Sequence, residues 1–188
     1  MPAVIRLVAG LGNPGLQYQG TRHNAGYQFV ELLAQRYRAT FRNDPRFHGE
    51  VCRIHAHGHE CWLLKPTTFM NRSGQSVSSL ARYYKISLQQ LLVAHDELDL
   101  PAGTARLKAG GGHAGHNGLR DIVSAMDGGD FWRLRLGIDR PSDSRQVVDY
   151  VLGRPSRDGA QAIDRAVGAA ADVLPEMRSG EFQRAVPL

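Results

Sequence analysis

Short apolar runs alternate along this chain with stretches of helical periodicity, and this alternation restricts the fold more than any other feature. Val4–Ala9 and Leu91–Ala94 are typical of buried strands, and Trp132–Ile138 alternates between apolar and polar residues as a half-exposed strand does. Segments of helical spacing follow these runs. Strands interleaved with helices predict an α/β fold, a mixed twisted β-sheet packed between α-helices. A length of 188 residues favours one domain spanning residues 1–188.

The remaining elements follow from the same spacing rules. Val51–Ala56 and Cys61–Leu64 flank a polar turn at residues 57–60 and predict a hairpin. In the alternating strand, Arg133 and Arg135 occupy the polar side. Helices are expected over residues 24–38, after Ser73, after Asn117, and in the tail around residues 146–152 and 159–173.

Four polar runs carry side chains suited to hydrolysis. In open α/β sheets, sites gather in the loops at the carboxyl ends of strands, where the Asn13 and Asp96 loops are both expected. His23 can act as a base if an acceptor holds its far nitrogen, and Asp96 is the best-placed acid. Asn13, Asn71 and Asn117 supply neutral amides that can orient water or stabilise an oxyanion. This set suits water attacking a carbonyl, with no metal and no covalent nucleophile.

Other interpretations of these runs remain open. Asparagine is common at caps and turns, so Asn117 could simply cap the helix that follows. His113 and His116 near Asp96 suggest a metal, although glycines surround both histidines and no third ligand has recognisable spacing. Gly10-x-Gly12-x-x-Gly15 matches the dinucleotide fingerprint, but helical periodicity begins several residues too late for that role. A non-catalytic RNA-binding domain would explain the charge but not the four polar loops.

The formal charge of +5 and the pI of about 9.6 suggest an anionic partner such as nucleic acid. Arg106 and Lys108 share one face of a predicted strand, and with Arg135 they form a possible phosphate-binding patch. An ordinary solvated strand face and a genome bias toward arginine are the alternatives. No apolar run approaches a bilayer span and no signal peptide is evident, so a cytoplasmic protein is expected. Two cysteines, Cys52 and Cys61, are expected to be reduced.

Six motifs in order along the chain resemble those of the bacterial peptidyl-tRNA hydrolase family. The matching segments are Gly10–Gly15, Thr21–Asn24, Lys65–Asn71 with Ser73-Gly74, His95–Pro101, Gly110–Gly118 and Phe131–Ile138. The segment beyond Gly153 matches only loosely. Position 106 is arginine where lysine is also familiar, which keeps the charge and changes the phosphate geometry.

The resemblance implies hydrolysis of the ester between a peptide and the terminal ribose of tRNA, by a cytoplasmic monomer that needs no metal or other cofactor and recycles tRNA for translation. It implies His23 as general base, Asp96 as its holder, and Asn13 as the group that binds the peptide and distinguishes blocked from free aminoacyl groups. Asn71 and Asn117 would contact substrate and position water or the oxyanion. The implied contacts with the tRNA and the cleft lining are Tyr18, Phe69, Met70, His116, Arg106, Lys108 and Arg135.

Overall fold

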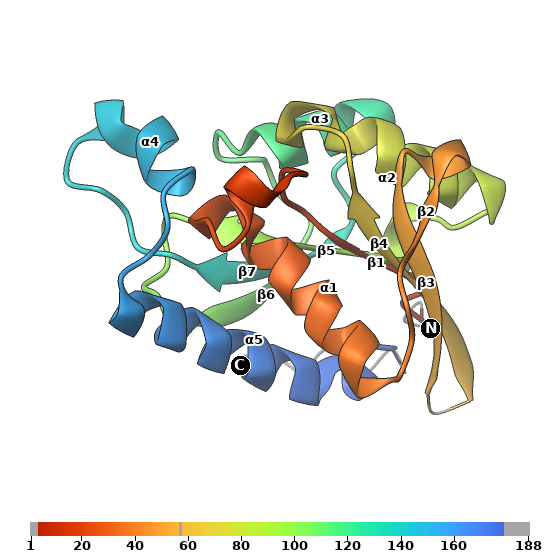
Figure 1. The fold of residues 1–188 in the computed structure, drawn as a ribbon. Coiled ribbons are helices and arrows are strands. Elements are labelled where there is room, and N and C mark those ends of the chain that lie inside the picture. The colour runs from red at the N-terminus through yellow and green to blue at the C-terminus, as the bar shows by residue number, and fades with distance from the viewer. Residues whose placement is uncertain (1–3, 57, 179–188) are drawn as a thin grey trace.

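The computed structural model describes residues 4–56 and 58–178 and shows a seven-stranded mixed sheet in the order β2-β3-β4-β1-β5-β7-β6 (Figure 1). The strands are β1 (Leu7–Gly10), β2 (Arg42–Asp44), β3 (Gly49–Ala56), β4 (His59–Pro66), β5 (Leu91–Glu97), β6 (Ala105–Ala109) and β7 (Trp132–Gly137). The inner pairs β4–β1, β1–β5 and β5–β7 are parallel, and the outer pairs are antiparallel. The predicted α/β fold with a mixed sheet is confirmed.

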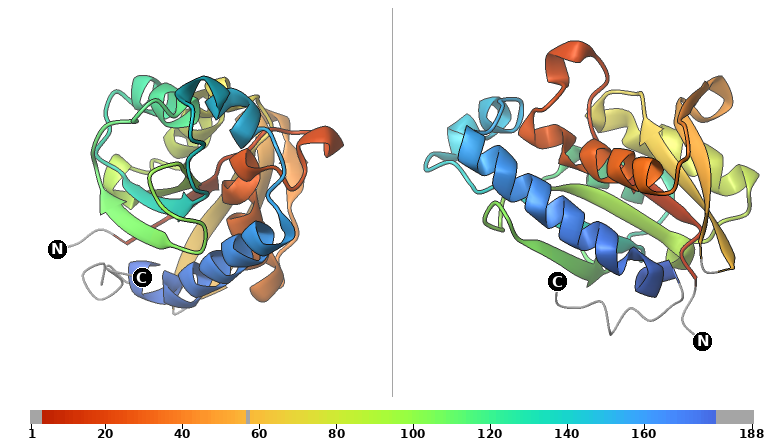
Figure 2. Two further views of the ribbon diagram at one scale, coloured as in Figure 1. Left: turned by 90° about the vertical axis from the view of Figure 1, so that its left-hand side faces the viewer. Right: turned by 60° about the horizontal axis from the view of Figure 1, so that its bottom comes forward.

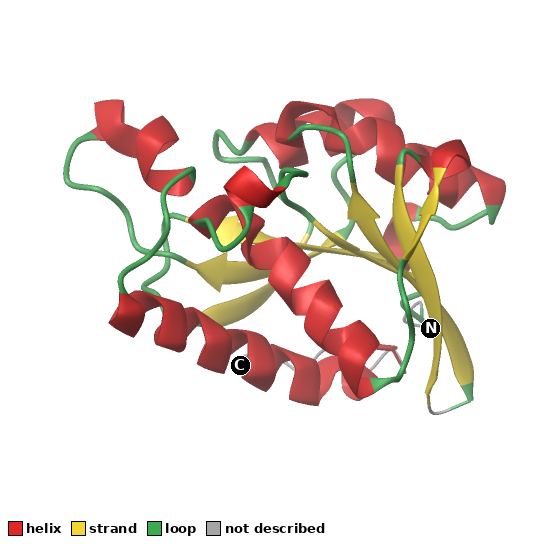
Figure 3. Ribbon diagram, viewed as in Figure 1, coloured by secondary structure: helices red, strands yellow, loops and turns green. Residues whose placement is uncertain are grey.

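Helices cover both faces of the sheet (Figures 2 and 3). They are α1 (Ala25–Arg36), α2 (Ser73–Tyr83), α3 (Asn117–Ala125), α4 (Val147–Val151) and α5 (Arg157–Arg178). One apolar core joins α1 and α5 to one sheet face, and a second joins α2 and α3 to the other. The short α4 lies beyond the carboxyl end of β7 (Figure 1), and its Val151 packs at the end of the core that α1 and α5 share. Among the described residues, no helix has the length and apolar character required to cross a membrane.

Two glycines on either side of the first loop, Gly10 of β1 and Gly26 of α1, allow close packing between strand and helix. A Cβ on Gly10 would lie 2.2 Å from the carbonyl oxygen of Gly26, and one on Gly26 would lie 2.3 Å from that of Ala94. These distances are far below van der Waals contact, so α1 can cross β1 and β5 only where side chains are missing. A 3-10 helix (Leu16–Tyr18) follows Gly15, and α1 begins only at Ala25. The dinucleotide geometry is therefore absent here, as the late periodicity predicted.

Most predicted elements are present with shifted ends, and one surface was wrongly predicted. The hairpin strands β3 and β4 are longer than expected, and residue 57 of the predicted turn lies outside the described residues. On β7, Arg133 is only 2% exposed, so the polar side of this strand is not simply solvated. Cys52 and Cys61 are both buried free thiols.

The carboxyl ends of β1 and β5 meet where the two strands separate. The last sheet contact between them pairs Gly10 with Ala94. Beyond it, the chain of β1 turns toward the Asn13 loop, whereas β5 continues through His95 and Asp96. Such a divergence of parallel strands opens a crevice at the edge of a sheet. The polar loops predicted to converge do so in this crevice.

Candidate active site

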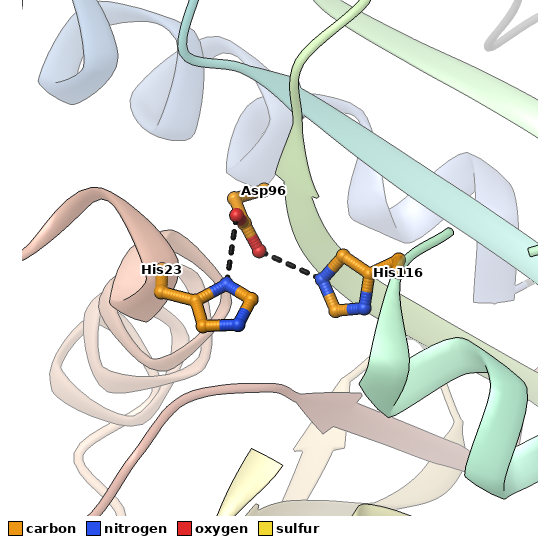
Figure 4. Close-up of side chains that lie close together, drawn as sticks. All are labelled: His23, Asp96 and His116. Atoms are coloured by element: carbon orange, nitrogen blue, oxygen red, sulfur yellow. Dashed lines mark hydrogen bonds and ion pairs between the residues drawn. The ribbon is translucent and has the colours of Figure 1, made fainter. Parts of the chain in front are cut away.

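Asp96 lies between two histidines in the crevice (Figure 4). Its Oδ2 is 2.8 Å from Nδ1 of His23, and its Oδ1 is 2.8 Å from Nε2 of His116. The carboxylate comes from the end of β5, His23 from a 3-10 helix (Arg22–Asn24) before α1, and His116 from the loop before α3. Three segments distant in sequence thus form one histidine–aspartate cluster, defined as His23, Asp96 and His116.

The hydrogen bonds fix the tautomers of both rings. His116 is the N-cap of α3, because its Nδ1 accepts from the backbone N–H groups of Gly118 at 3.1 Å and Leu119 at 3.3 Å. A nitrogen that accepts carries no proton, so Nε2 of His116 carries it and donates to Asp96. The cap that was suggested for Asn117 therefore belongs to His116. In His23, Nδ1–H donates to Asp96, which leaves the lone pair on Nε2.

Charge balance within the cluster follows from its burial. Burial alone would raise the pKa of Asp96, but the charge and hydrogen bonds of His23 and His116 outweigh it and hold this pKa far below its usual range. For His23, burial lowers the pKa, whereas the charge and hydrogen bond of Asp96 raise it and prevail. Asp96 therefore stays ionised and favours a protonated His23, the form produced when this ring accepts a proton.

Asn13 is held rigidly beside the cluster. Its backbone N–H donates to Asn24 Oδ1 at 2.8 Å, and Asn24 Nδ2 donates to its carbonyl at 3.0 Å. Its own Oδ1 accepts from the backbone N–H of Met70 at 2.8 Å. Because the oxygen end of the amide is occupied, the Nδ2 end is the donor left for the cleft that Asn13 lines. The sequence shows Asn24 next to His23, but it did not predict that Asn24 holds the backbone of Asn13.

The other two amides lie at the mouth of the cleft. Asn71 and Asn117 are exposed and line the same cleft as His23, Asp96 and Asn13. Asn117 is the first residue of α3, and its Oδ1 accepts from Arg120 at 3.3 Å. The structure therefore brings all five predicted reaction-centre residues to one cavity, with one buried amide and two accessible ones.

The cleft has a volume of about 460 Å³ and one strongly apolar wall. Val147, Val148 and Val151 of α4 form this wall with Leu152 and Leu98, and Phe69 and Met70 also line the cleft. Val148 is 66% exposed, which is unusual for a valine on a small helix. The sequence predicted a helix here but gave no sign that it borders the site, because a long connection separates it from every polar motif.

Two aromatic residues predicted to contact the tRNA end are neighbours. The rings of Tyr18 and Phe69 are 6.3 Å apart in an edge-to-face arrangement. Phe69 is 58% exposed and reaches the cleft, whereas Tyr18 is half-buried outside it. Exposed aromatic faces at the rim of a polar cleft are suited to stacking on bases.

Basic side chains follow one face of β6 and β7 and form a cationic strip, defined as Arg106, Lys108, Arg133 and Arg135. Arg106 lies opposite Arg135 and Lys108 opposite Arg133 in the antiparallel register, so all four share one face. Nε of Arg135 donates to Glu97 Oε1 at 2.9 Å, and Glu97 lines the cleft. The strip therefore adjoins the cleft without being part of it.

Arg133 is the member of the strip whose burial the sequence did not predict. Its guanidinium lies over the ring of Phe131 at 4.3 Å, and Nη2 donates to the carbonyl of Gly111 at 2.7 Å. Nε and Nη1 are buried with no partner among the described residues. Burial lowers the pKa of this arginine, because removing its charge from water is unfavourable. A Cβ on Gly111 would lie 2.9 Å from Nζ of Lys108, so both cations meet the same glycine.

The residue types of the cluster could also ligate a metal. Nδ1 of His23, Nε2 of His116 and the carboxylate of Asp96 lie within 4.8 Å of one another. In this arrangement both nitrogens are 2.8 Å from a carboxylate oxygen, the spacing of an N–H···O hydrogen bond. The donor atoms thus point at Asp96 rather than at a common centre. His113 is outside this group of possible ligands, and its Nδ1 accepts from the backbone N–H of Gly115 at 3.0 Å.

Comparison with known proteins matches this fold and site to one family. A family model described as peptidyl-tRNA hydrolase matches residues 7–187. The peptidyl-tRNA hydrolase of Halorhodospira halophila is 52% identical over 180 residues, 96% of this chain and 93% of that protein. That of Neisseria meningitidis serogroup C is 48% identical over 185 residues, 98% and 96% of the two chains. A crystal structure of the Arg119Gln mutant of the Acinetobacter baumannii enzyme superposes with a TM-score of 0.96, at 46% identity, covering 98% of this chain and 94% of that one.

The α/β sheet, with a buried histidine–aspartate cluster and neutral amides in one cleft, is that of a hydrolase. Within that class, the chain belongs to the peptidyl-tRNA hydrolase family. The family hydrolyses the ester bond of peptidyl-tRNA and serves translation. The resemblance drawn from the six sequence motifs is confirmed.

Proposed function

We propose that His23 activates the water that attacks the ester carbonyl of peptidyl-tRNA. The carrying observation is the bond between Nδ1 of His23 and Oδ2 of Asp96, which leaves the basic lone pair on Nε2. The side chain of His23 is 13% exposed, so it can meet a water molecule in the cleft while Asp96, at 2%, stays covered. A general base of this kind typically contributes about 10² to 10⁴ in rate.

In the proposed reaction, Nε2 of His23 takes a proton from water as the oxygen bonds to the carbonyl carbon. The resulting imidazolium is stabilised by Asp96, and it then donates the proton to the ribose oxygen as the carbon–oxygen ester bond breaks. The products are tRNA with a free ribose hydroxyl and the peptide's carboxylic acid, which releases the second proton of the water to solvent and becomes a carboxylate. An alkoxide leaving from an ester requires less help than an amine, so one imidazole can serve both steps.

We assign the amides to substrate placement and charge stabilisation. Nδ2 of Asn13 is the fixed donor, suited to a carbonyl oxygen of the peptide, because its amide cannot turn without losing the bond to Met70. Asn71 and Asn117 lie at the accessible mouth, where they can hold water or the oxyanion of the tetrahedral intermediate. A preorganised donor of this type is worth roughly 10² to 10³ in rate.

We assign the cationic strip and the aromatic pair to the tRNA. Arg106, Lys108 and Arg135 lie on one sheet face beside the cleft and can bind phosphates, and Phe69 with Tyr18 can stack against the terminal bases. The apolar wall of α4 is left for the peptide side. We also infer that the enzyme works as a monomer, because the cluster and the three amides all come from one chain, and in the cytoplasm, where translation leaves its substrate.

The deciding experiment is release of free tRNA from an N-blocked aminoacyl-tRNA, measured with and without a chelator. Turnover that persists with the chelator and is lost in His23→Ala, with tRNA binding retained, is the expected result. Turnover that disappears on chelation would instead require a metal at the histidine–aspartate cluster. A His23→Ala variant as fast as the parent would remove the proposed base.

A further inference from the structure

Each of the three oxygens of Asp96 accepts a hydrogen bond from a different histidine. His23 and His116 donate to the two carboxylate oxygens, and Nδ1 of His95 lies 2.8 Å from the backbone carbonyl oxygen. The ring of His95 is 2% exposed and stands edge to face with that of His116, with 5.2 Å between centroids. His95 thus completes a shell of imidazoles around one aspartate.

The position of this carbonyl explains why it needs a donor. Carbonyls alternate along a strand, so those of Ala94 and Asp96 point toward β1, and that of Glu97 points toward β7. The Ala94 carbonyl accepts from the N–H of Leu11 at 3.0 Å, and the Glu97 carbonyl accepts from Ile138 at 3.0 Å. By the level of Asp96, β1 has turned away into the Asn13 loop. The imidazole of His95 replaces the missing strand.

We propose that His95 is a positioning residue for ester hydrolysis, holding the peptide unit of Asp96 so that its carboxylate meets His23 and His116 together. The inference rests on the proposed roles of His23 and Asp96. It assigns His95 no contact with substrate or with the reacting atoms.

The surroundings of His95 keep it a neutral donor. Burial, followed by the neighbouring charge of His116, lowers its pKa to about 3, while Asp96 acts in the opposite direction and Arg133 of β7 adds to the lowering. The ring therefore carries one proton, which Nδ1 uses for the Asp96 carbonyl. Nε2 is buried without a partner among the described residues. A residue needed only to fill this space would be better apolar, because an unpaired buried polar atom is costly.

The test compares two isosteric variants, His95→Asn and His95→Leu. The amide nitrogen of asparagine can take the place of Nδ1, whereas leucine has the same branching and no donor. We expect His95→Leu to lower kcat by roughly tenfold or more, as loss of an outer hydrogen-bond partner does, with KM unchanged. The acid limb of its pH profile should move to lower pH, because a misplaced Asp96 raises the pKa of His23 less. His95→Asn should recover kcat and the parental limb.

Equal kcat values in the two variants, with acid limbs at the same pH, would overturn the inference. A loss of kcat in proportion to the loss of Tm would also overturn it, because it would indicate a merely structural role. If His95→Leu does not fold, His95→Asn decides alone: it must keep at least about a tenth of the parental kcat, the lower bound of the same effect. His23→Ala run in parallel separates the two proposals. An active His23→Ala removes the proposed function itself, whereas an inactive one beside a fully active His95→Leu removes only the role of His95.

Discussion

The histidine–aspartate cluster and the cationic strip lie next to each other, yet their polar atoms are satisfied to very different degrees. In the cluster, both carboxylate oxygens and three of the four ring nitrogens have partners within the protein. Among the described residues, Nε2 of His23 is the nitrogen left over. In the strip, two buried guanidinium nitrogens of Arg133 have no partner in the part of the chain that the structure describes, and Lys108 lies over Gly111.

The difference indicates that the cluster and the strip have different functions. A cluster in which every polar atom but one has a partner holds that one atom in a single orientation, as a chemical step requires. Cations spread along a strand face instead offer charge to a partner that supplies its own oxygens, as phosphate binding requires. Changes in the cluster should therefore alter kcat, and changes in the strip should alter affinity and its dependence on salt.

The largest effect is expected from His23→Ala. Losing the base should lower kcat by about 10² to 10⁴ while the affinity for uncharged tRNA stays within about twofold, since the strip is intact. Single-turnover rates and tRNA titration provide the measurement, with His55→Ala, an exposed histidine of β3, as the control. A parallel loss of affinity would show that the two regions are not separable in this way.

Asp96→Asn should have the next largest effect, a loss of roughly 10² in kcat, because an amide no longer selects the tautomer of His23. The direction in which the acid limb of the pH profile moves follows from the pKa of His23. His23 works as a base only when unprotonated, and Asp96 raises its pKa against the opposing effect of burial. Without that charge the pKa falls, so the acid limb should move to lower pH. Asp99→Asn, an exposed acid paired with Arg140, is the control. A limb at the parental pH would contradict the pairing.

Arg135→Ala tests the strip. We expect the affinity for tRNA to fall by roughly tenfold and the slope of log affinity against log salt to decrease by about 1, with kcat at saturation unchanged. Arg53→Ala is a matched control, because Arg53 is also a strand arginine paired with a glutamate, but on β3. If both variants behave alike, the phosphates bind elsewhere.

The smallest effect is expected from Arg133→Met. Two nitrogens of this buried guanidinium have no partner within residues 4–56 and 58–178, and replacing such a charge by an apolar side chain of similar length is often neutral or stabilising. The free energy of unfolding, measured with urea, should stay constant or rise by about 1 kcal/mol. A fall of more than about 2 kcal/mol would show that its bond to Gly111 and its contact with Phe131 outweigh the burial of charge.

The sequence predicted those features that depend on local spacing. Strand and helix periods gave the fold class, and the carboxyl-end rule brought the Asn13 and Asp96 loops together. The pairing of His23 with Asp96 followed from the sequence context of that acid. Local spacing does not show which loop covers a strand face. Arg133 was therefore expected at the surface, although the loop at Gly111 buries it. His95 gave no signal, because its role arises where β1 leaves β5. The α4 wall was missed for the same reason, since only the folded chain brings it to the cleft.

The cap at the start of α3 makes two backbone amides into reporters of the cluster. Nδ1 of His116 accepts from Gly118 and Leu119, so any proton that reaches this nitrogen must release both N–H groups at once. In a ¹⁵N-labelled sample, these two resonances should move together if substrate binding changes the hydrogen bonds of His116. The first turn of a helix would thus record events at a carboxylate that carries no nitrogen label of its own.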